Sequence, residues 1–474
     1  MVKLGHANYQ NPFGRLFNYY LINVTKTLEN IRDWAFAIFL GAVFGLMVYK
    51  HWALPIGLAL SLILILFVLR FPYFAIVMPF YGVFFTRSLH VAAGINYNLL
   101  SWFLLVVFYA FAVLVILHRR PNIIDFTPNA AVWISTVFLC IYIMYALLAK
   151  YPVPWSYKAV GHLIILDFIP LIVLTMILTD HIEFEKIALA YIATITVIIL
   201  ISIFKYRVVA PSFLQRFNLV QGPPTSYGRS LAVGGIFSVW LFNRYKKVLI
   251  KAFAILIFAG CIYFLLKTGT RGSLGGFIIG FVIYFLLLKI PWWKKILAAL
   301  VFAGIIIVYF KSGVAATMVM RIKSAIKGLE VATITRIYLY KIAIEHIKQS
   351  PWIGVGVGGY HNLVTHLLYY NYYPHNMPLE VWVELGIIGL VTYASLVILT
   401  LVRGIKIVIN YFRTENPKYE MGLLLSVLFI FGLAVSQISG NIPWNYHFWF
   451  SIALVNAYYV LLKRETKNAR VQNG

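Results

Sequence analysis

The chain has 474 residues, of which 62% are hydrophobic and only 11% are charged, with a formal net charge of +26. This composition excludes a soluble globular domain. Apolar runs of about 16 to 20 residues recur from Trp34 to Leu462, and runs of that length are typical of membrane-spanning helices rather than of short alternating barrel strands. The sequence therefore predicts an all-α, polytopic transmembrane helical bundle.

Taken in chain order, the apolar runs predict about 12 to 14 spans. Some thirty polar and aromatic residues precede the first run and contain no small-residue cleavage site, which indicates a first helix that stays inserted rather than a signal peptide. The candidate spans are 34–49, 53–69, 73–86, 98–117, 130–148, 160–179, 187–204, 230–243, 250–266, 274–288, 296–310, 378–402, 420–440 and 446–462.

The basic loops predict the orientation of the bundle. When loops are assigned alternately to the two sides, Arg119, Lys247, Lys295 and Arg403 share one side, which the positive-inside rule identifies as the cytoplasm. The expected divisions are a cytoplasmic N-terminal segment 1–33, a transmembrane bundle 34–310, a periplasmic loop 311–377, C-terminal transmembrane helices 378–462 and a cytoplasmic tail 463–474. Within the long outer loop, the pattern predicts two amphipathic helices, at about 314–328 and 334–349.

The outer face carries lysines and arginines that the positive-inside rule does not require. Few carboxylates accompany them, so the surface favours a phosphate-bearing or otherwise acidic ligand and argues against a divalent-metal site. The alternative for individual lysines is an interfacial role, in which they extend to anionic lipid head groups. These outer cations are Lys50, Arg87, Lys150, Lys158, Lys205, Arg207, Arg216, Arg229, Lys267, Arg271, Lys311, Arg321, Lys323, Lys327, Arg336, Lys341 and Lys348.

Two motifs in this region contain side chains suited to binding a ligand. The first, at 268–273, reads Thr-Gly-Thr-Arg-Gly-Ser, in which the glycines allow a close approach of the backbone and Arg271 offers planar donors for phosphate oxygens. The alternative is a tight interhelical turn. The second is Arg336, with Tyr340 and Ala343 on the same helical face, followed by a glycine-rich run at 351–360. No strand precedes that run, so we interpret it as a flexible or close-approach loop rather than a dinucleotide fingerprint.

A third motif lies at the entry to the span that follows. Asn376 is a good N-cap and Pro378 is tolerated in a first turn, which places His375 just before the positive end of a helix. That dipole and nearby arginines favour the neutral imidazole, which accepts a proton. Glu384 lies in the same span, where a carboxylate is costly, and we expect it to orient His375 or to pair with an outer arginine.

Together these motifs resemble the O-antigen ligase and polymerase superfamily of bacterial envelope enzymes. The resemblance covers roughly residues 200–440. It rests on Thr270-Arg271-Gly272, on Arg336 with Pro351-Trp352-Ile353-Gly354-Val355-Gly356, and on His375-Asn376 leading into Leu379, Glu384-Leu385-Gly386 and Gly389-Leu390.

The resemblance implies a GT-C-like glycosyltransferase of the inner membrane. Such enzymes take a glycan from undecaprenyl pyrophosphate on the periplasmic side, without metal or other cofactor, and pass it to a lipid A core sugar in ligases or to another repeat unit in polymerases. By position, Arg271, Arg336 and His375 match the family's essential residues, and Arg216 and Arg229 match less closely. We expect Arg216, Arg229, Tyr340, Asn376 and Glu384 to bind substrate.

The sequence is compatible with three functions. Ligase and polymerase share these motifs, and the third candidate, of another class, is a transporter or flippase of lipid-linked glycans. A transporter would need polar residues through the depth of the bilayer, whereas here they gather at its outer boundary. Apart from membrane lipids, the expected partners are the lipid-linked donor and a glycan acceptor, and no nucleic acid.

Overall fold

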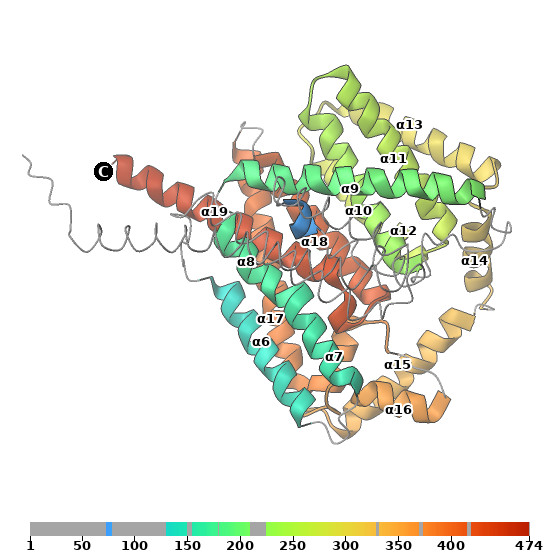
Figure 1. Ribbon diagram of the computed structural model, residues 1–474, viewed down its shortest axis with the longest axis vertical. Helices are drawn as coiled ribbons and strands as arrows, with labels where there is room; N and C mark the ends of the chain where they lie inside the picture. The colour runs from blue at the N-terminus through green and yellow to red at the C-terminus, as the bar shows by residue number, and fades with distance from the viewer. Residues whose placement is uncertain are drawn as a thin grey trace, which may run out of the picture. The chain divides into compact units, whose positions relative to one another are not determined.

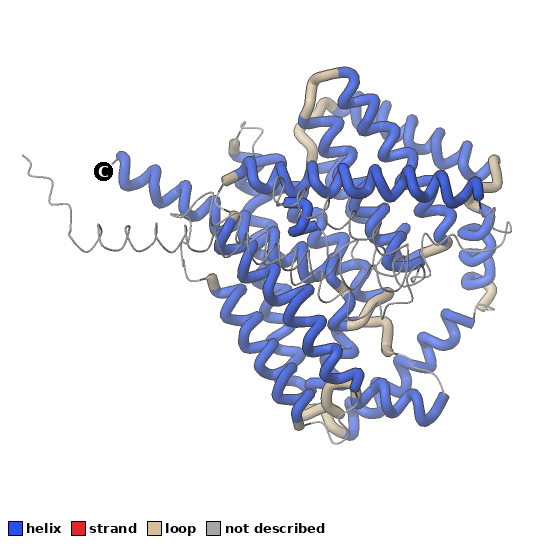
Figure 2. The backbone as a smooth tube through the Cα atoms, viewed as in Figure 1, coloured by secondary structure: helices blue, strands red, loops and turns tan. Residues whose placement is uncertain are grey.

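The computed structural model describes residues 73–77, 129–148, 154–178, 180–208, 224–328, 331–368, 373–414 and 419–473. These residues all belong to one compact unit of the chain, made of residues 68–88 and 96–474. Within the described ranges the chain forms helices joined by loops and contains no β-strand (Figures 1 and 2). The predicted all-α class is confirmed.

The helices alternate with short connections over most of the chain. Those before the outer loop are α3 (Tyr73–Val77), α6 (Ala130–Leu147), α7 (Pro154–His162), the π-helix η3 (Leu163–Phe168), α8 (Ile169–Ile177), α9 (His181–Val208), α10 (Pro224–Arg244), α11 (Val248–Thr268), α12 (Arg271–Leu287) and α13 (Trp292–Lys311). They are followed by α14 (Ala316–Ile326), α15 (Val331–Gln349), α16 (Gly359–Leu368), α17 (Met377–Arg413), α18 (Glu420–Ile438), the 3-10 helix η5 (Ile442–Trp444) and α19 (Tyr446–Asn473).

Within the described ranges, six helices are long and apolar enough to cross a membrane: α6, α9, α11, α13, α17 and α18. The helix α12 is shorter and also apolar. The chain is thus a multi-pass membrane protein. The expected spans 34–49, 53–69 and 98–117, together with the N-terminal segment 1–33, lie outside the described residues, and of the expected span 73–86 only α3 is described.

Two of the expected segments have features that the sequence did not predict. The span expected at 160–179 corresponds to a continuous helical run of α7, η3 and α8, in which a π-helical turn at Leu163–Phe168 precedes Pro170. Proline has no N–H to donate, and a wider π turn is a common way for a helix to accommodate such an interruption. At the C-terminal end, α19 continues as helix to Asn473, through the segment expected as a tail.

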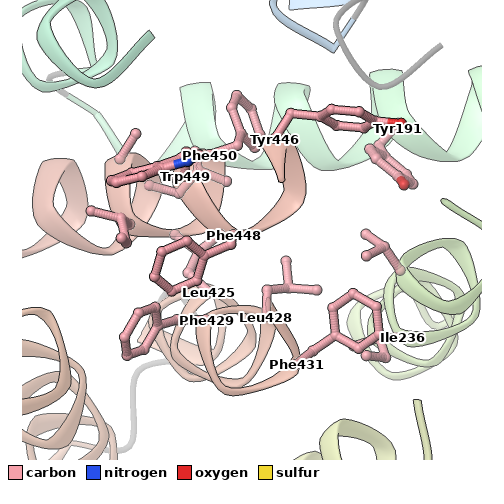
Figure 3. Packing of buried hydrophobic residues seen from close by; sticks show 14 of the residues in the cluster. Tyr191, Ile236, Leu425, Leu428, Phe429, Phe431, Tyr446, Phe448, Trp449 and Phe450 are labelled. Carbon is pink, nitrogen blue, oxygen red and sulfur yellow. The ribbon is translucent and has the colours of Figure 1, made fainter. Parts of the chain in front are cut away.

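The helix α18 lies in the middle of the main hydrophobic core, packed against α12, α17, α19 and α10. Figure 3 shows Phe431 of α18 directed toward Ile236 of α10, and Phe429 facing Phe448 of α19 with ring centroids 6.2 Å apart. On the α12 side, a Cβ atom on Gly276 would lie 2.5 Å from Val435, so the two helices are in close contact. Small residues commonly allow such approaches between membrane helices.

The helix α17 is interrupted at Gly386, whose φ of 64° and ψ of −165° are not helical. The break frees two carbonyl groups, and the glycine-rich loop supplies their donors: Val355 N–H donates to Val383 O and Gly356 N–H to Glu384 O, both at 2.9 Å. Backbone groups deprived of water must be paired in this way.

Two glycines allow the loop to lie this close to α17. A Cβ atom on Gly386 would fall 2.2 Å from Trp352 O, and one on Gly354 would fall 2.6 Å from Glu384 O. Both residues have positive φ angles, of 64° and 74°, which glycine adopts without penalty. The expectation of a close-approach loop at 351–360 is confirmed.

A small second core supports this arrangement. It contains Leu339 and Ala343 of α15, Tyr360 and Val364 of α16, and Val383 of α17. The helices α14 and α15 occupy the region where two amphipathic helices were predicted, whereas α16 was not predicted. The first turns of α17, expected to lie in a span that continues to 402, therefore pack against the outer-loop helices.

Candidate functional site

Several helix ends meet at one cavity of about 750 Å³. The helices α10, α12 and α17 begin beside it, and α11 and α18 end there. Its described lining contains no Asp or Glu, although three arginines and a histidine take part. The lining residues are Thr225, Gly269, Thr270, Arg271, Gly272, Ser273, Arg321, Ala325, Ala332, Thr333, Thr335, Arg336, Tyr373, His375, Ile438 and Ser439.

Arg271 enters the cavity from the first turn of α12. The preceding helix ends because Gly269 adopts a left-handed conformation with φ of 61°, and the Thr268 and Thr270 hydroxyls lie 2.7 Å apart across the turn. The guanidinium donates to the Thr333 hydroxyl of α15 at 3.4 Å. A helix N-terminus presents unpaired N–H groups and a partial positive charge, so this turn combines two elements that bind phosphate.

Two further arginines approach from α14 and α15. Arg336 lies on α15, and Arg321 lies on α14 together with Ala325, one turn away on the same face. From the sequence, Arg321 was predicted only as one of many outer cations. Its role could not be distinguished from that of Lys323 or Lys327, because composition does not show which side of an amphipathic helix faces a cavity.

His375 has an unusual backbone conformation, with φ of 59°, which is rare for a residue other than glycine and costs on the order of 1–3 kcal/mol. The resulting turn brings its ring to within 4.2 Å of the Tyr373 ring, between centroids. The Nδ1 atom is buried and has no hydrogen-bond partner among the described residues. The pKa of His375 is lowered to about 4, first by burial and then by the positive charges of Arg336 and Arg229. The imidazole is therefore neutral at physiological pH.

Asn376 fixes the position of this histidine. Its side-chain oxygen accepts from Leu379 N–H at 3.0 Å, which makes it the N-cap of α17 as predicted. The side-chain amide also donates to Gln437 O at 3.2 Å, near the end of α18. Asn376 is thus engaged within the protein and is not one of the residues that line the cavity.

Arg229 lies behind the cavity wall rather than in the wall itself. It is 4% exposed, and it donates to Ser439 O and, at 3.2 Å, to Asn445 Oδ1. No described carboxylate forms an ion pair with it, and its Nε has no partner among the described residues. A buried guanidinium without a carboxylate is costly, and here its charge lies one residue away from the cavity through Ser439.

The remaining predicted residues have different surroundings. Glu384 is 2% exposed and accepts from Gly358 N–H at 3.1 Å, so the structure gives it a bond to the glycine-rich loop in place of the expected arginine or histidine. Tyr340 is half-buried near Arg336 and does not line the cavity. Arg216 lies outside the described residues. Roles for these three residues in substrate binding stay predictions.

Two other elements of the site were not predicted from the sequence. Tyr373 lies against His375, and the α18–α19 connection supplies Ser439 to the lining. Glu380 of α17 contacts this connection, because its carboxylate accepts a hydrogen bond from Ile442 N–H at 3.3 Å. In the sequence, the polar stretch Ser-Gly-Asn at 439–441, directly after an apolar span, was the available signal.

The electrostatics of the cavity suit an anion. In the described part of the chain, no group of three or more His, Cys, Asp or Glu side chains could hold a metal ion. Donors from Arg271, Arg321 and Arg336 converge with the α12 N-terminus, and beside them lies a neutral imidazole. This arrangement can bind a phosphate-bearing molecule and accept a proton next to it.

Comparison with known proteins agrees with the sequence motifs. Residues 254–394 match the family model described as O-antigen ligase. This range runs from α11 into α17 and contains Arg271, Arg321, Arg336 and His375. No curated protein matches the chain. The segment that forms most of the cavity is therefore similar to the O-antigen ligase family.

Proposed function

We propose that this protein transfers a glycan from undecaprenyl pyrophosphate to the hydroxyl group of an acceptor sugar on the periplasmic face of the inner membrane. The observation that carries the proposal is the cavity in which Arg271, Arg321, Arg336 and His375 meet with no carboxylate among the described lining residues. A lipid-linked donor and a glycan acceptor are what similarity to the O-antigen ligase family implies.

The pyrophosphate occupies the space between the arginines and the first turn of α12. When the bond between the sugar and the pyrophosphate breaks, negative charge accumulates on the departing phosphate oxygen. Fixed guanidinium groups and helix N–H groups at that position stabilise the charge in the transition state. The reaction then has no need of a metal ion to hold the leaving group.

His375 acts as the general base. Its neutral ring takes the proton of the acceptor hydroxyl while the hydroxyl oxygen attacks the anomeric carbon. Because the pyrophosphate brings negative charge close to the ring, donor binding should raise the pKa of His375 and make it a stronger base than in the empty cavity. None of the described lining residues is a carboxylate that could act as the nucleophile of a two-step route, and a single displacement would invert the anomeric centre.

Arg229 acts without contacting the donor. Its bond to Ser439 O fixes part of the cavity wall, and its charge helps to keep His375 neutral before the donor arrives. The negative charge of the donor would in turn compensate this buried cation. We therefore replace the expected role of Arg229 in direct binding with one in positioning and electrostatics.

The acceptor is left open between two choices. A ligase transfers the glycan to a lipid A core sugar, whereas a polymerase transfers it to another repeat unit, and both use the same donor chemistry. A strain lacking this protein distinguishes them: long chains that stay on the carrier indicate a ligase, and single repeats on lipid A indicate a polymerase.

The proposal is tested by reconstituting purified protein with a lipid-linked glycan and candidate acceptors. His375→Ala should lower transfer by about 10²- to 10⁴-fold, the usual contribution of a general base, while binding of the donor changes little. The matched control is His181→Ala, because His181 lies at the start of α9 in contact with Glu465 and does not line the cavity. Unchanged transfer by His375→Ala would remove the base from the scheme.

A further inference from the structure

One face of α12 leads away from the cavity. Residues 271, 275, 278, 282 and 286 are spaced so that they share one side of a helix. Arg271 lines the cavity at one end, and the apolar residues Ile278, Val282 and Leu286 follow, each 44–53% exposed. We call Gly275, Ile278, Val282 and Leu286 the α12 strip.

The strip begins with an opening. Among the described residues, a Cβ atom on Gly275 would have no heavy atom within 4 Å, whereas one on the neighbouring Gly276 would lie 2.5 Å from Val435 of α18. The first helical turn beyond Arg271 thus has no described neighbour beside Gly275. The rise of an α-helix makes the distance from Arg271 to Leu286 about 22 Å, most of the roughly 30 Å thickness of the hydrocarbon core.

Neighbouring helices border the strip on both sides. On one side the ring of Phe281 stacks on Phe302 of α13, with centroids 4.7 Å apart. On the other side a Cβ atom on Gly272 would lie 3.4 Å from Ile438 of α18, which itself lines the cavity. The strip is therefore a defined apolar surface between α13 and α18 that is continuous with the cavity.

We propose that the α12 strip binds the polyprenyl tail of the lipid-linked donor. This inference rests on the proposed function, which puts the pyrophosphate at the N-terminus of α12. A diphosphate held there by Arg271 must direct its hydrocarbon chain into the bilayer, and the strip is the apolar surface that starts one turn below that arginine. The missing side chain at Gly275 leaves room for the first isoprene units beside the backbone.

The test measures equilibrium binding of two probes to the full-length protein in detergent: undecaprenyl pyrophosphate, and inorganic pyrophosphate, which has no hydrocarbon tail. Gly275→Leu fills the opening. A leucine favours helix more than glycine does, and no neighbour obstructs it, so the variant should fold. The matched control is Gly304→Leu on α13, where a Cβ atom also has no heavy atom within 4 Å.

We expect Gly275→Leu to weaken binding of undecaprenyl pyrophosphate about tenfold and binding of inorganic pyrophosphate less than twofold, with Gly304→Leu unchanged for both probes. Equal weakening of both probes, or no weakening of undecaprenyl pyrophosphate binding, overturns the proposal. Absence of binding of either probe to the unaltered protein also overturns it. Gly275→Leu could selectively weaken binding of undecaprenyl pyrophosphate while the unaltered protein transfers no glycan. That result would support the α12 strip as the tail-binding surface and reject the proposed function.

Discussion

The two ends of the bundle use cationic side chains in different ways. At the end away from the cavity, several of these side chains have an oxygen partner at short distance. Arg244 lies 2.7 Å from the Glu185 carboxylate, Lys289 donates to Thr414 O at 2.6 Å, and Arg403 donates to the side-chain oxygens of two asparagines at 2.5 and 2.6 Å. Here the positive charge is engaged within the protein.

At the cavity end, the carboxylates face elsewhere. Glu380 and Glu384 accept from backbone N–H groups of loops, and no described lining residue is acidic. Arg271 donates to the Thr333 hydroxyl at 3.4 Å, at the long limit of a hydrogen bond. Within the described residues, an arginine–glutamate ion pair is thus found at the end away from the cavity, whereas the cavity lining contains arginines and no described carboxylate.

The largest expected effect follows from the shape of the guanidinium group. Arg271→Lys keeps the charge and loses the planar set of donors, so glycan transfer should fall about 10²- to 10³-fold. Lys289→Gln at the opposite end should leave transfer within about twofold, because that side chain contacts the Thr414 carbonyl and the Tyr411 ring, neither of which lines the cavity. Full activity of Arg271→Lys would mean that charge alone suffices at the cavity.

The second prediction compares two glycines of α17, one near each end. Gly386→Ala should destabilise the fold by about 3 kcal/mol or more, because the added Cβ meets Trp352 O at 2.2 Å and φ is positive. Gly404→Ala is the control, since its Cβ has ordinary contacts of 3.5 and 3.6 Å with Ser426. Thermal unfolding in detergent measures both variants. Equal stability of the two would contradict the close contact of loop and helix.

The third prediction concerns pH. His375 accepts a proton only while it is neutral, so kcat/KM should fall as the pH decreases through about 4 in the unaltered protein. Arg229→Gln removes one of the charges that lower this pKa, and the acid limb should then move to higher pH. Arg229→Lys keeps the charge and should leave the limb in place.

The profile of kcat adds a second readout. It reports the complex with donor, in which the pyrophosphate lies near the ring, so its acid limb should lie at higher pH than that of kcat/KM. If Arg229→Gln lowers activity without moving either limb, Arg229 supports only the cavity wall.

The smallest effect is expected at the opposite end. Arg244→Gln should cost about 0–1 kcal/mol of unfolding free energy, since both partners of the Arg244–Glu185 pair are partly exposed. A double-mutant cycle with Glu185→Gln measures the interaction, with transfer activity as the second readout. A large loss of transfer in Arg244→Gln would show that this end also takes part in the reaction.

Much of the fold and part of the site were accessible from the sequence. Apolar runs predict spans because hydrocarbon leaves helices few alternatives, and Asn376 was identified as an N-cap because capping depends on local chemistry. The convergence of Arg271, Arg336 and His375 was expected from the resemblance. The loop charges predicted that these three residues lie on the same side of the bundle, and in the structure all three line one cavity.

Other features depend on three-dimensional packing that no local pattern records. Nothing near Gly386 indicates a broken helix, because hydropathy averages over the break and its donors come from a loop some thirty residues away. Similarly, Arg229 and Arg321 look alike as outer cations, yet one is buried behind the wall and the other lines the cavity. Only the positions of neighbouring helices separate the two roles.

The break in α17 has a consequence for biosynthesis. An interrupted helix that entered lipid alone would expose the Val383 and Glu384 carbonyls to hydrocarbon. The chain makes their donors first: the loop at 351–358 leaves the ribosome before α17 does. The loop that supplies the donors is therefore synthesised before the interrupted helix, and stable insertion of α17 requires that this loop is already in place.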